Sequence, residues 1–168
     1  LIYASLGGHI EVVRSLIGNG AGVNAQDTQG GTALIYEAEK RHHDIVQCLI
    51  NEDAKVKAKD MYGWNALIYS ADQGDYDIVQ MLIEKGAGVN VQDKDGGTAL
   101  IYAAQDGHLR VVQYLLKKGA EINVMDKYHK TALIVAAELG YSRVARVLIC
   151  TGADVNICDN TNAVALIY

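Results

Sequence analysis

Residues 93–125 read DKDGGTALIYAAQDGHLRVVQYLLKKGAEINVM, and altered copies of this stretch run along the chain. The aspartate that opens it recurs every 33 residues, at Asp27, Asp60, Asp93, Asp126 and Asp159. The leucine of the T-A-L element keeps the same interval, at Leu1, Leu34, Leu67, Leu100, Leu133 and Leu166. Two markers that keep one period without insertion or deletion indicate a repeat protein.

Each period predicts two short helices. Residues 98–105 form one apolar stretch, and residues 108–117 form a second one with apolar side chains at helical spacing. Gly119 follows the second helix, where a left-handed residue that ends a helix is expected. The Asp- and Gly-rich stretch between successive helix pairs predicts an extended turn. Helices of two or three turns are marginal alone in water, so their stability must come from stacking on neighbouring repeats.

The pattern D-x-x-G-x-T-x-L-x-x-A-A-x-x-G-H-x-x-V-V-x-x-L-L-x-x-G-A-x-x-N, present at residues 93–123, resembles the ankyrin repeat. This resemblance extends over essentially the whole chain. It implies an all-α solenoid of stacked helix-turn-helix pairs with β-turn or hairpin loops. We predict a single array over residues 1–168, with a truncated repeat at 1–26, full repeats at 27–59, 60–92, 93–125 and 126–158, and the start of a further repeat at 159–168.

Some repeats depart from the family pattern. T-A-L-I stands where the family has T-P-L-H, so the turns that lead into the first helices are expected to be slightly looser. In repeat 27–59, Arg41 and Asp53 replace the two glycines and Lys57 replaces the asparagine. We predict that this repeat is the least stable one, although Asp53 is compatible with a left-handed backbone.

Both ends of the sequence are apolar where terminal repeats usually carry a polar outer face. Leu1, Ile2 and Leu6 would have no upstream neighbour, and Leu166 and Ile167 would have no downstream one. The sequence therefore looks like a fragment of a larger protein or an engineered array, and we expect self-association through the uncapped ends.

Composition argues against several classes of partner. The formal net charge of −5 makes a nucleic acid an unlikely main partner, because phosphate backbones usually require a basic face. No apolar run is long enough for a membrane span and no signal peptide opens the sequence, so a cytoplasmic, intracellular protein is expected.

Chemical motifs are lacking in the sequence. Cys48, Cys150 and Cys158 fit neither a disulfide framework nor a metal pattern, and Cys48 and Cys150 are expected to act as small apolar residues of second helices. His42 and His43 are sequence neighbours without a third ligand at a defined spacing. There is no nucleophile elbow and no phosphate-binding glycine loop. We therefore expect a protein that is not an enzyme and that needs no cofactor or metal.

Tyrosine occupies one repeat position in a regular way. The residue two positions after each repeat leucine is Tyr3, Tyr36, Tyr69, Tyr102, Val135 and Tyr168. In the ankyrin fold this position lies on the first helix near the concave face. Each tyrosine could fill space between first helices with its hydroxyl in water, or the row could form a binding surface; the two interpretations are compatible.

The leading functional hypothesis is a non-enzymatic module that binds another protein through its turn tips and the concave face. The resemblance supplies part of this inference, and side chains that vary on a constant scaffold supply the rest. The candidate partner-binding residues are Tyr36, Met61, Tyr62, Trp64, Tyr69, Asp72, Lys94, Tyr102, Asp106, Lys127, Tyr128 and Lys130. The recognition hot spot is predicted at Trp64 with Tyr62, Tyr69 and Tyr102.

Two alternatives stay open. The turn segment DMYGWNAL loosely resembles the aromatic fingertip of oligoadenylate-sensing ribonucleases, so Trp64 could serve a small-ligand or oligonucleotide sensor. The acidic next turn, with Asp93 and Asp95 around Lys94, is a poor phosphate environment. The array could also be a structural spacer in a longer solenoid.

Overall fold

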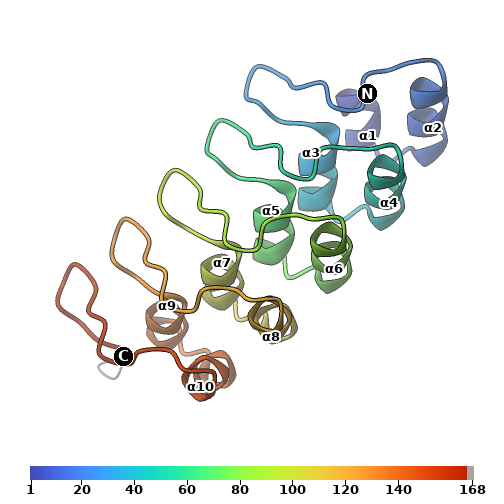
Figure 1. Cartoon of the computed structure of the whole chain (residues 1–168). Coiled ribbons are helices and arrows are strands. Elements are labelled where there is room, and N and C mark those ends of the chain that lie inside the picture. The colour runs from blue at the N-terminus through green and yellow to red at the C-terminus, as the bar shows by residue number, and fades with distance from the viewer. Residues whose placement is uncertain (166–168) are drawn as a thin grey trace. The chain divides into compact units, whose positions relative to one another are not determined.

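The structure is a computed structural model that describes residues 1–165 (Figure 1). In this part of the chain it contains ten α-helices and no β-strand, which confirms the all-α prediction. The helices are α1 (Ile2–Leu6), α2 (Ile10–Gly18), α3 (Ala33–Lys40), α4 (His43–Asn51), α5 (Ala66–Asp72), α6 (Tyr76–Glu84), α7 (Ala99–Gln105), α8 (Leu109–Lys117), α9 (Ala132–Glu138) and α10 (Ser142–Cys150). Helices α3, α5, α7 and α9 begin 33 residues apart, so the sequence period is also the structural period.

Side-chain caps start the first helices without proline. The hydroxyl oxygens of Thr32, Thr98 and Thr131 each accept a hydrogen bond from the backbone N–H three residues later. Asn65 caps α5 in the same way, at 2.9 Å from the Ile68 nitrogen. Such caps satisfy a helix N–H that has no partner within the helix. The looser turns expected from the missing proline stay a prediction.

The chain forms two compact units. Unit 1 comprises Leu1–Ser70 with Asp77–Gly88, and unit 2 comprises Ala71–Tyr76 with Val89–Tyr168. In unit 1, α1 packs on α2 and α3, and α4 packs on α2 and α3. In unit 2, α7 packs on α8 and α9, and α10 packs on α8 and α9. Within each unit the first helices of the pairs form one layer and the second helices form another (Figure 1).

Within each unit, the core lies between the two helices of a pair and between neighbouring pairs. The repeat leucines Leu34, Leu67, Leu100 and Leu133 are all buried. Second helices contribute one apolar face, such as Val111, Val112 and Leu115 of α8. Each fully buried leucine stabilises the fold by roughly 1.5–3 kcal/mol relative to an exposed one. Short helices therefore persist because their neighbours cover them.

Each full repeat has a left-handed residue at its turn tip and one after each of its two helices. Gly107 and Gly119 have φ values of 70° and 87°, which confirms the turn predicted after α8. Arg41 and Asp53 adopt φ values of 62° and 57° at the matching positions of repeat 27–59. The backbone thus keeps the repeat geometry even where the residue disfavours it.

Asparagine side chains tie successive turns together. The Asn24 Oδ1 accepts a hydrogen bond from the Lys55 backbone N–H at 2.7 Å, and the Asn90 Oδ1 accepts one from Glu121 at 2.8 Å. Lys57 occupies the corresponding position of repeat 27–59, and it makes no hydrogen bond of this kind in the described part of the chain. This turn lacks one of the connections that its neighbours have.

The apolar N-terminal residues are only partly covered. Leu1 and Ile2 are half-buried, and Leu6 is exposed. The matching expectation for Leu166 and Ile167 lies outside the described residues. Within residues 1–165, no helix has the length and hydropathy needed to cross a membrane.

Candidate functional site

An aspartate holds together the tip of each turn that leads from one repeat into the first helix of the next. The Asp60 Oδ1 accepts hydrogen bonds from the backbone N–H groups of Tyr62 and Trp64, both at 2.9 Å. The Asp126 Oδ1 makes the same pair of bonds with Tyr128 and Lys130, both at 2.8 Å. Local bonds of this type stabilise a turn without help from the side chains at its tip. The tip side chains are thus held in place but are not needed for the turn.

The second carboxylate oxygen of the same aspartates binds the repeat tyrosine. The hydroxyl of Tyr36 donates to the Asp27 Oδ2 at 2.6 Å. The equivalent Tyr69–Asp60 and Tyr102–Asp93 bonds measure 2.8 and 2.5 Å. We call this contact the tyrosine–aspartate clasp. It joins the first helix of a repeat to its own turn tip, a role that neither interpretation of the tyrosine row included.

The clasp raises the pKa of the tyrosines, and in one repeat it lowers the pKa of the aspartate. Its hydrogen bond is the main cause that raises the pKa of Tyr36 to about 12 and lowers the pKa of Asp27. For Tyr69 and Tyr102, burial is the largest cause that raises the pKa, followed by the hydrogen bond to the aspartate. The raised pKa values mean that the clasp favours the neutral phenol.

Trp64 packs against its own repeat tyrosine. Its ring centroid lies 4.8 Å from that of Tyr69, with the rings tilted by 56°. In two other repeats this position is Gly31 or Gly97, where an added Cβ would lie within 2.6 Å of the Tyr36 or Tyr102 side chain. Trp64 instead makes a tilted ring contact with its tyrosine and is half-buried. One side of the Trp64 ring therefore already contacts Tyr69. In the sensor hypothesis, a nucleobase could stack only on the other side of the ring.

The turn at residues 60–64, in unit 1, exposes two large side chains. Met61 and Tyr62 are 48% and 58% exposed. They lie directly between the clamping aspartate and Trp64, so unit 1 brings together Met61, Tyr62, Trp64 and Tyr69, four of the predicted binding residues. Tyr36 is also in unit 1 and holds the preceding turn.

The turn at residues 126–130, in unit 2, presents an aromatic ring next to a cation. Tyr128 is 55% exposed, and the Lys127 ammonium lies 5.0 Å from the centre of its ring. The same ammonium is 2.8 Å from an Asp95 carboxylate oxygen, a contact that raises the pKa of Lys127. Lys130 forms an ion pair with Glu138. Lys127, Tyr128 and Lys130 thus form one patch at a single turn.

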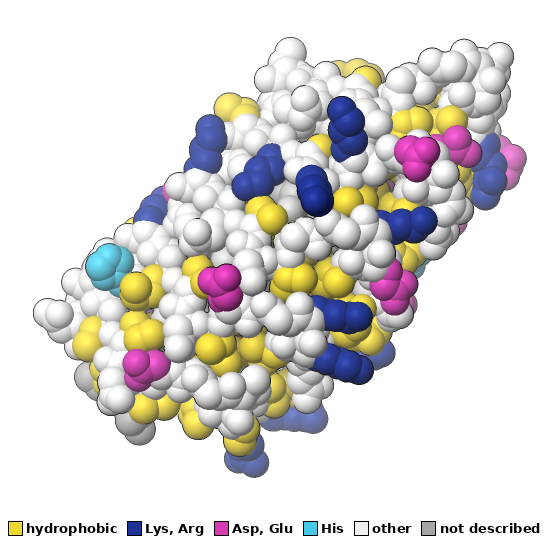
Figure 2. Space-filling view, in the orientation of Figure 1, with side chains coloured by type: hydrophobic (Ala, Val, Ile, Leu, Met, Phe, Trp, Pro, Cys, Tyr) yellow, Lys and Arg dark blue, Asp and Glu magenta, His cyan; other side chains and the backbone are white. Residues whose placement is uncertain are grey.

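The remaining predicted residues do not join these tips. Asp72 has a raised pKa, first because it is partly buried and then because Asp106 repels it. Lys94 is exposed, and Tyr102 is committed to its clasp with Asp93. On the face drawn in Figure 2, Lys and Arg side chains are separated by hydrophobic and uncharged groups.

Histidines and cysteines take structural places. His9 and His108 are the N-cap residues of α2 and α8. Cys48 is buried on α4, whereas Cys150 at the end of α10 is exposed. Both cysteines lie on second helices, as expected, but only Cys48 contributes to the core.

Sequence reasoning missed a buried carboxyl group on a first helix. Glu37 of α3 is fully buried, and its Oε2 accepts a hydrogen bond from the His42 Nδ1 at 2.7 Å. Its other oxygen has no hydrogen-bond partner among the described residues. The sequence contained a signal for this burial, because other repeats have the small apolar residues Ala103 and Ala136 at the repeat position of Glu37.

Comparison with known families agrees with the geometry of the repeats. The family model described as ankyrin repeats (3 copies) matches residues 1–93 and 85–159. No curated protein matches the sequence significantly. The matched residues cover most of the chain, and the helix pairs inside them follow the same period of 33 residues. The chain therefore belongs to the ankyrin-repeat family.

Proposed function

We propose that this protein is a non-enzymatic interaction module that binds another protein through its turn tips and the adjoining first helices. Ankyrin repeats are generally protein–protein interaction modules. Because a fold alone does not establish a function, the proposal needs support from the side chains themselves.

The observation that carries the proposal is the exposure of aromatic side chains on clamped turns. Tyr62 and Tyr128 are each more than half exposed, although the backbone next to them is fixed by Asp60 and Asp126. Aromatic anchors dominate the energetics of protein interfaces, and a fixed backbone lowers the entropy lost on binding. These residues give little to folding and much to recognition.

Trp64 has a double role in this proposal. Its half-buried ring supports Tyr69, and its remaining surface adjoins the exposed Met61 and Tyr62. Removing it should therefore weaken both stability and binding, whereas removing Tyr62 should weaken binding alone. This difference makes Tyr62 the cleaner probe of function.

Affinity capture with the full chain tests the proposal. Partners recovered by the wild type should be lost with the double variant that combines Tyr62→Ala and Tyr128→Ala. In a binding isotherm, this variant should bind a recovered partner more weakly by about 2 kcal/mol or more. The control is Ile149→Ala, because Ile149 is 50% exposed but lies on the second helix α10, outside the turn tips and first helices. Circular dichroism melts should be unchanged in both variants. The spacer alternative predicts that the double variant and the control recover the same proteins, and that result would overturn the proposal.

A further inference from the structure

The second helices of the repeats change the sign of their charge along the chain. One repeat position in their first turn is Glu11 in α2, Asp44 in α4 and Asp77 in α6. The same position is Arg110 in α8 and Arg143 in α10, both of which lie in unit 2. The first turns of α8 and α10 contain no acidic residue. The charge at this position is therefore reversed in unit 2.

This reversal does not favour the helices themselves. The N-terminus of a helix carries a partial positive charge, so an acid in the first turn stabilises the helix and a cation there destabilises it. Arg110 recovers part of this loss, because its guanidinium lies 4.4 Å from the centre of the Tyr76 ring. The side chain of Arg143 makes no hydrogen bond, ion pair or ring contact within residues 1–165. Residues that break a local rule of folding without an evident gain are candidates for a functional role.

The two arginines belong to a larger group of cations. Helices α8 and α10 pack on one another in unit 2. The exposed cations on and directly after these helices, which we call the basic strip, are Arg110, Lys117, Lys118, Arg143 and Arg146. No Asp or Glu occurs in residues 107–120 or 139–153. In the described part of the chain, none of the five cations has an acidic partner, whereas Lys127 and Lys130 each have one.

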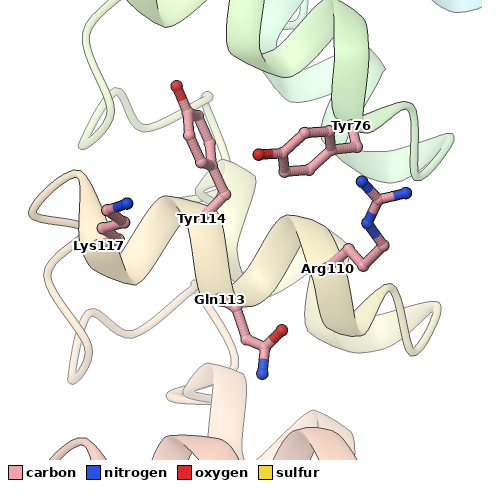
Figure 3. A pocket seen from close by; sticks show the side chains of 5 residues that line it. All are labelled: Tyr76, Arg110, Gln113, Tyr114 and Lys117. Carbon is pink, nitrogen blue, oxygen red and sulfur yellow. The ribbon is translucent and has the colours of Figure 1, made fainter.

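Three hollows lie along the basic strip, and each is lined by one of its arginines. The first, of about 240 Å³, lies on α8 beside Tyr76, and its Arg110 and Lys117 lie toward opposite ends of the helix (Figure 3). The second, of about 340 Å³, is lined by Arg143, and the third, of about 410 Å³, by Arg146. Among the described residues, no carboxylate lines any of the three. Each arginine therefore adjoins its own hollow, without an acid that would compete for it.

The spacing of these cations favours a ligand with several separate anionic groups. Because Arg110 and Lys117 lie toward opposite ends of α8 and the other two arginines are on α10, one small anion does not suit all of them. A protein segment with several Asp or Glu residues can offer one carboxylate to each cation. The planar guanidinium suits this pairing, because its N–H donors bind both oxygens of a carboxylate.

The narrowness of the basic strip favours a protein segment over a membrane. The turns that follow α8 and α10 carry the exposed acids Glu121 and Asp154. An anionic membrane extends beyond two helices, so these carboxylates would be repelled by it. A single segment that lies along α8 and α10 meets the cations alone.

We propose that the basic strip binds an acidic segment of a partner protein, with each arginine paired to a different carboxylate. Blocks of about five or more like charges often act as interaction tails, so such segments are a common kind of partner. Exposed ion pairs are weak singly, but several that form together give attraction and select the sign of the partner's charge. The strip lies outside the turn tips and first helices, so it adds a second contact surface to the function proposed above.

Fluorescence anisotropy with the full chain tests this, with a labelled oligoglutamate of about ten residues as the probe. The anisotropy should saturate at low ionic strength, and the Kd should rise steeply with salt. The double variant Arg110→Gln with Arg143→Gln should raise the Kd about fivefold or more. The control combines Arg14→Gln with Lys85→Gln, which makes the same charge change at the second helices of unit 1. Its Kd should stay within about twofold of the wild-type value.

Two results with this probe would overturn the proposal. One is the absence of a saturable change at about 1 mM oligoglutamate, since such a Kd marks very weak affinity. The other is equal weakening by the control variant, because the effect would then come from the net charge. Vesicles of equal parts phosphatidylserine and phosphatidylcholine test the other class of partner. Vesicle binding without oligoglutamate binding would assign the basic strip to a membrane and would also overturn the proposal.

The variant Arg110→Asp with Arg143→Asp separates binding from folding. It gives α8 and α10 the residue type that α4 and α6 have at this position. It should melt at or above the wild-type temperature, because the acid suits the first turn of a helix, and it should bind the probe no better than the glutamine variant. A lower melting temperature would show that the arginines serve folding, and unchanged affinity would remove them from the binding surface; either result contradicts the proposal. Tyr62 and Tyr128 stay intact in every variant, so the result is independent of the turn-tip proposal.

Discussion

Repeats 27–59 and 93–125 contain the same helix pair built on different turn residues. Arg41 and Gly107 both end a first helix in a left-handed conformation, at φ values of 62° and 70°. Glycine adopts it without strain, but a residue with a Cβ loses roughly 1–2 kcal/mol there. The comparison shows that the repeats keep one backbone geometry, and we expect the residues with a Cβ at left-handed positions to lower stability.

The two repeats also differ inside the helix pair and between turns. The buried Glu37 of α3 stands where α7 has Ala103. Lys57 stands where Asn123 accepts a hydrogen bond from the Asp154 backbone N–H at 2.9 Å. Both repeats nevertheless keep the tyrosine–aspartate clasp. Stability and the geometry of the turn tip are therefore set by separate residues.

The largest effect is expected when the arginine found at position 41 is introduced at the matching position 107 of repeat 93–125. A Cβ on Gly107 would lie 2.4 Å from the Tyr141 ring, so Gly107→Arg combines backbone strain with a steric clash. We expect the free energy of unfolding to fall by about 3 kcal/mol in a urea melt. Gly119→Arg is the matched control, because a Cβ there meets open space and only the strain of about 1 kcal/mol remains. Equal losses would show that the contact with Tyr141 is unimportant.

The next effect concerns the buried carboxylate. Glu37→Ala should raise the free energy of unfolding by about 1–2 kcal/mol, because it removes a buried polar group with one unpaired oxygen. Glu39→Ala, a partly exposed neighbour on α3, should change it by less than about 0.5 kcal/mol. A destabilised Glu37→Ala protein would mean that the His42 contact outweighs the cost of burial.

Exchanging the turn residues should give opposite effects of about 1 kcal/mol each. Asn123→Lys removes the hydrogen bond to Asp154 and should destabilise unit 2. Lys57→Asn restores the amide found in the other turns and should stabilise unit 1. Thermal melts of both variants measure this. If both variants shifted the melting temperature in the same direction, the asparagine side chain would not be the connection between successive turns.

The smallest effect is a pH dependence caused by the clasp. Because the folded pKa of Tyr36, about 12, exceeds the unfolded value near 10, its contribution is complete below pH 10 and is lost as pH rises toward 12. Tyr36→Phe should flatten this part of the stability curve by a few tenths of a kcal/mol. Asp27 has a lowered pKa, so its share is lost on the acid side, as pH falls below its unfolded value near 4. A curve with the same slope between pH 10 and 12 in both proteins would contradict the clasp.

Much of the fold could be predicted from the sequence because its signals are local. The apolar spacing predicted residues 98–105 and 108–117 as helices, close to the observed α7 and α8. The clasp was not predicted, although Asp27 and Tyr36 keep the same spacing in three repeats, because these side chains meet only after the turn folds back on the helix. The burial of Glu37 and the ring contact of Trp64 with Tyr69 likewise depend on packing that a linear pattern does not contain.

Native-state hydrogen exchange on the full chain is the most direct test of the claim that repeat 27–59 is the weakest part of the array. The amides of α3 and α4 should exchange through openings whose free energy is lower than for α7 and α8, by about 1–2 kcal/mol. The slowest amides should lie in α7 and α8, where glycine occupies both left-handed turns. The claim would be contradicted if residues 41–59 were the best-protected segment of the protein.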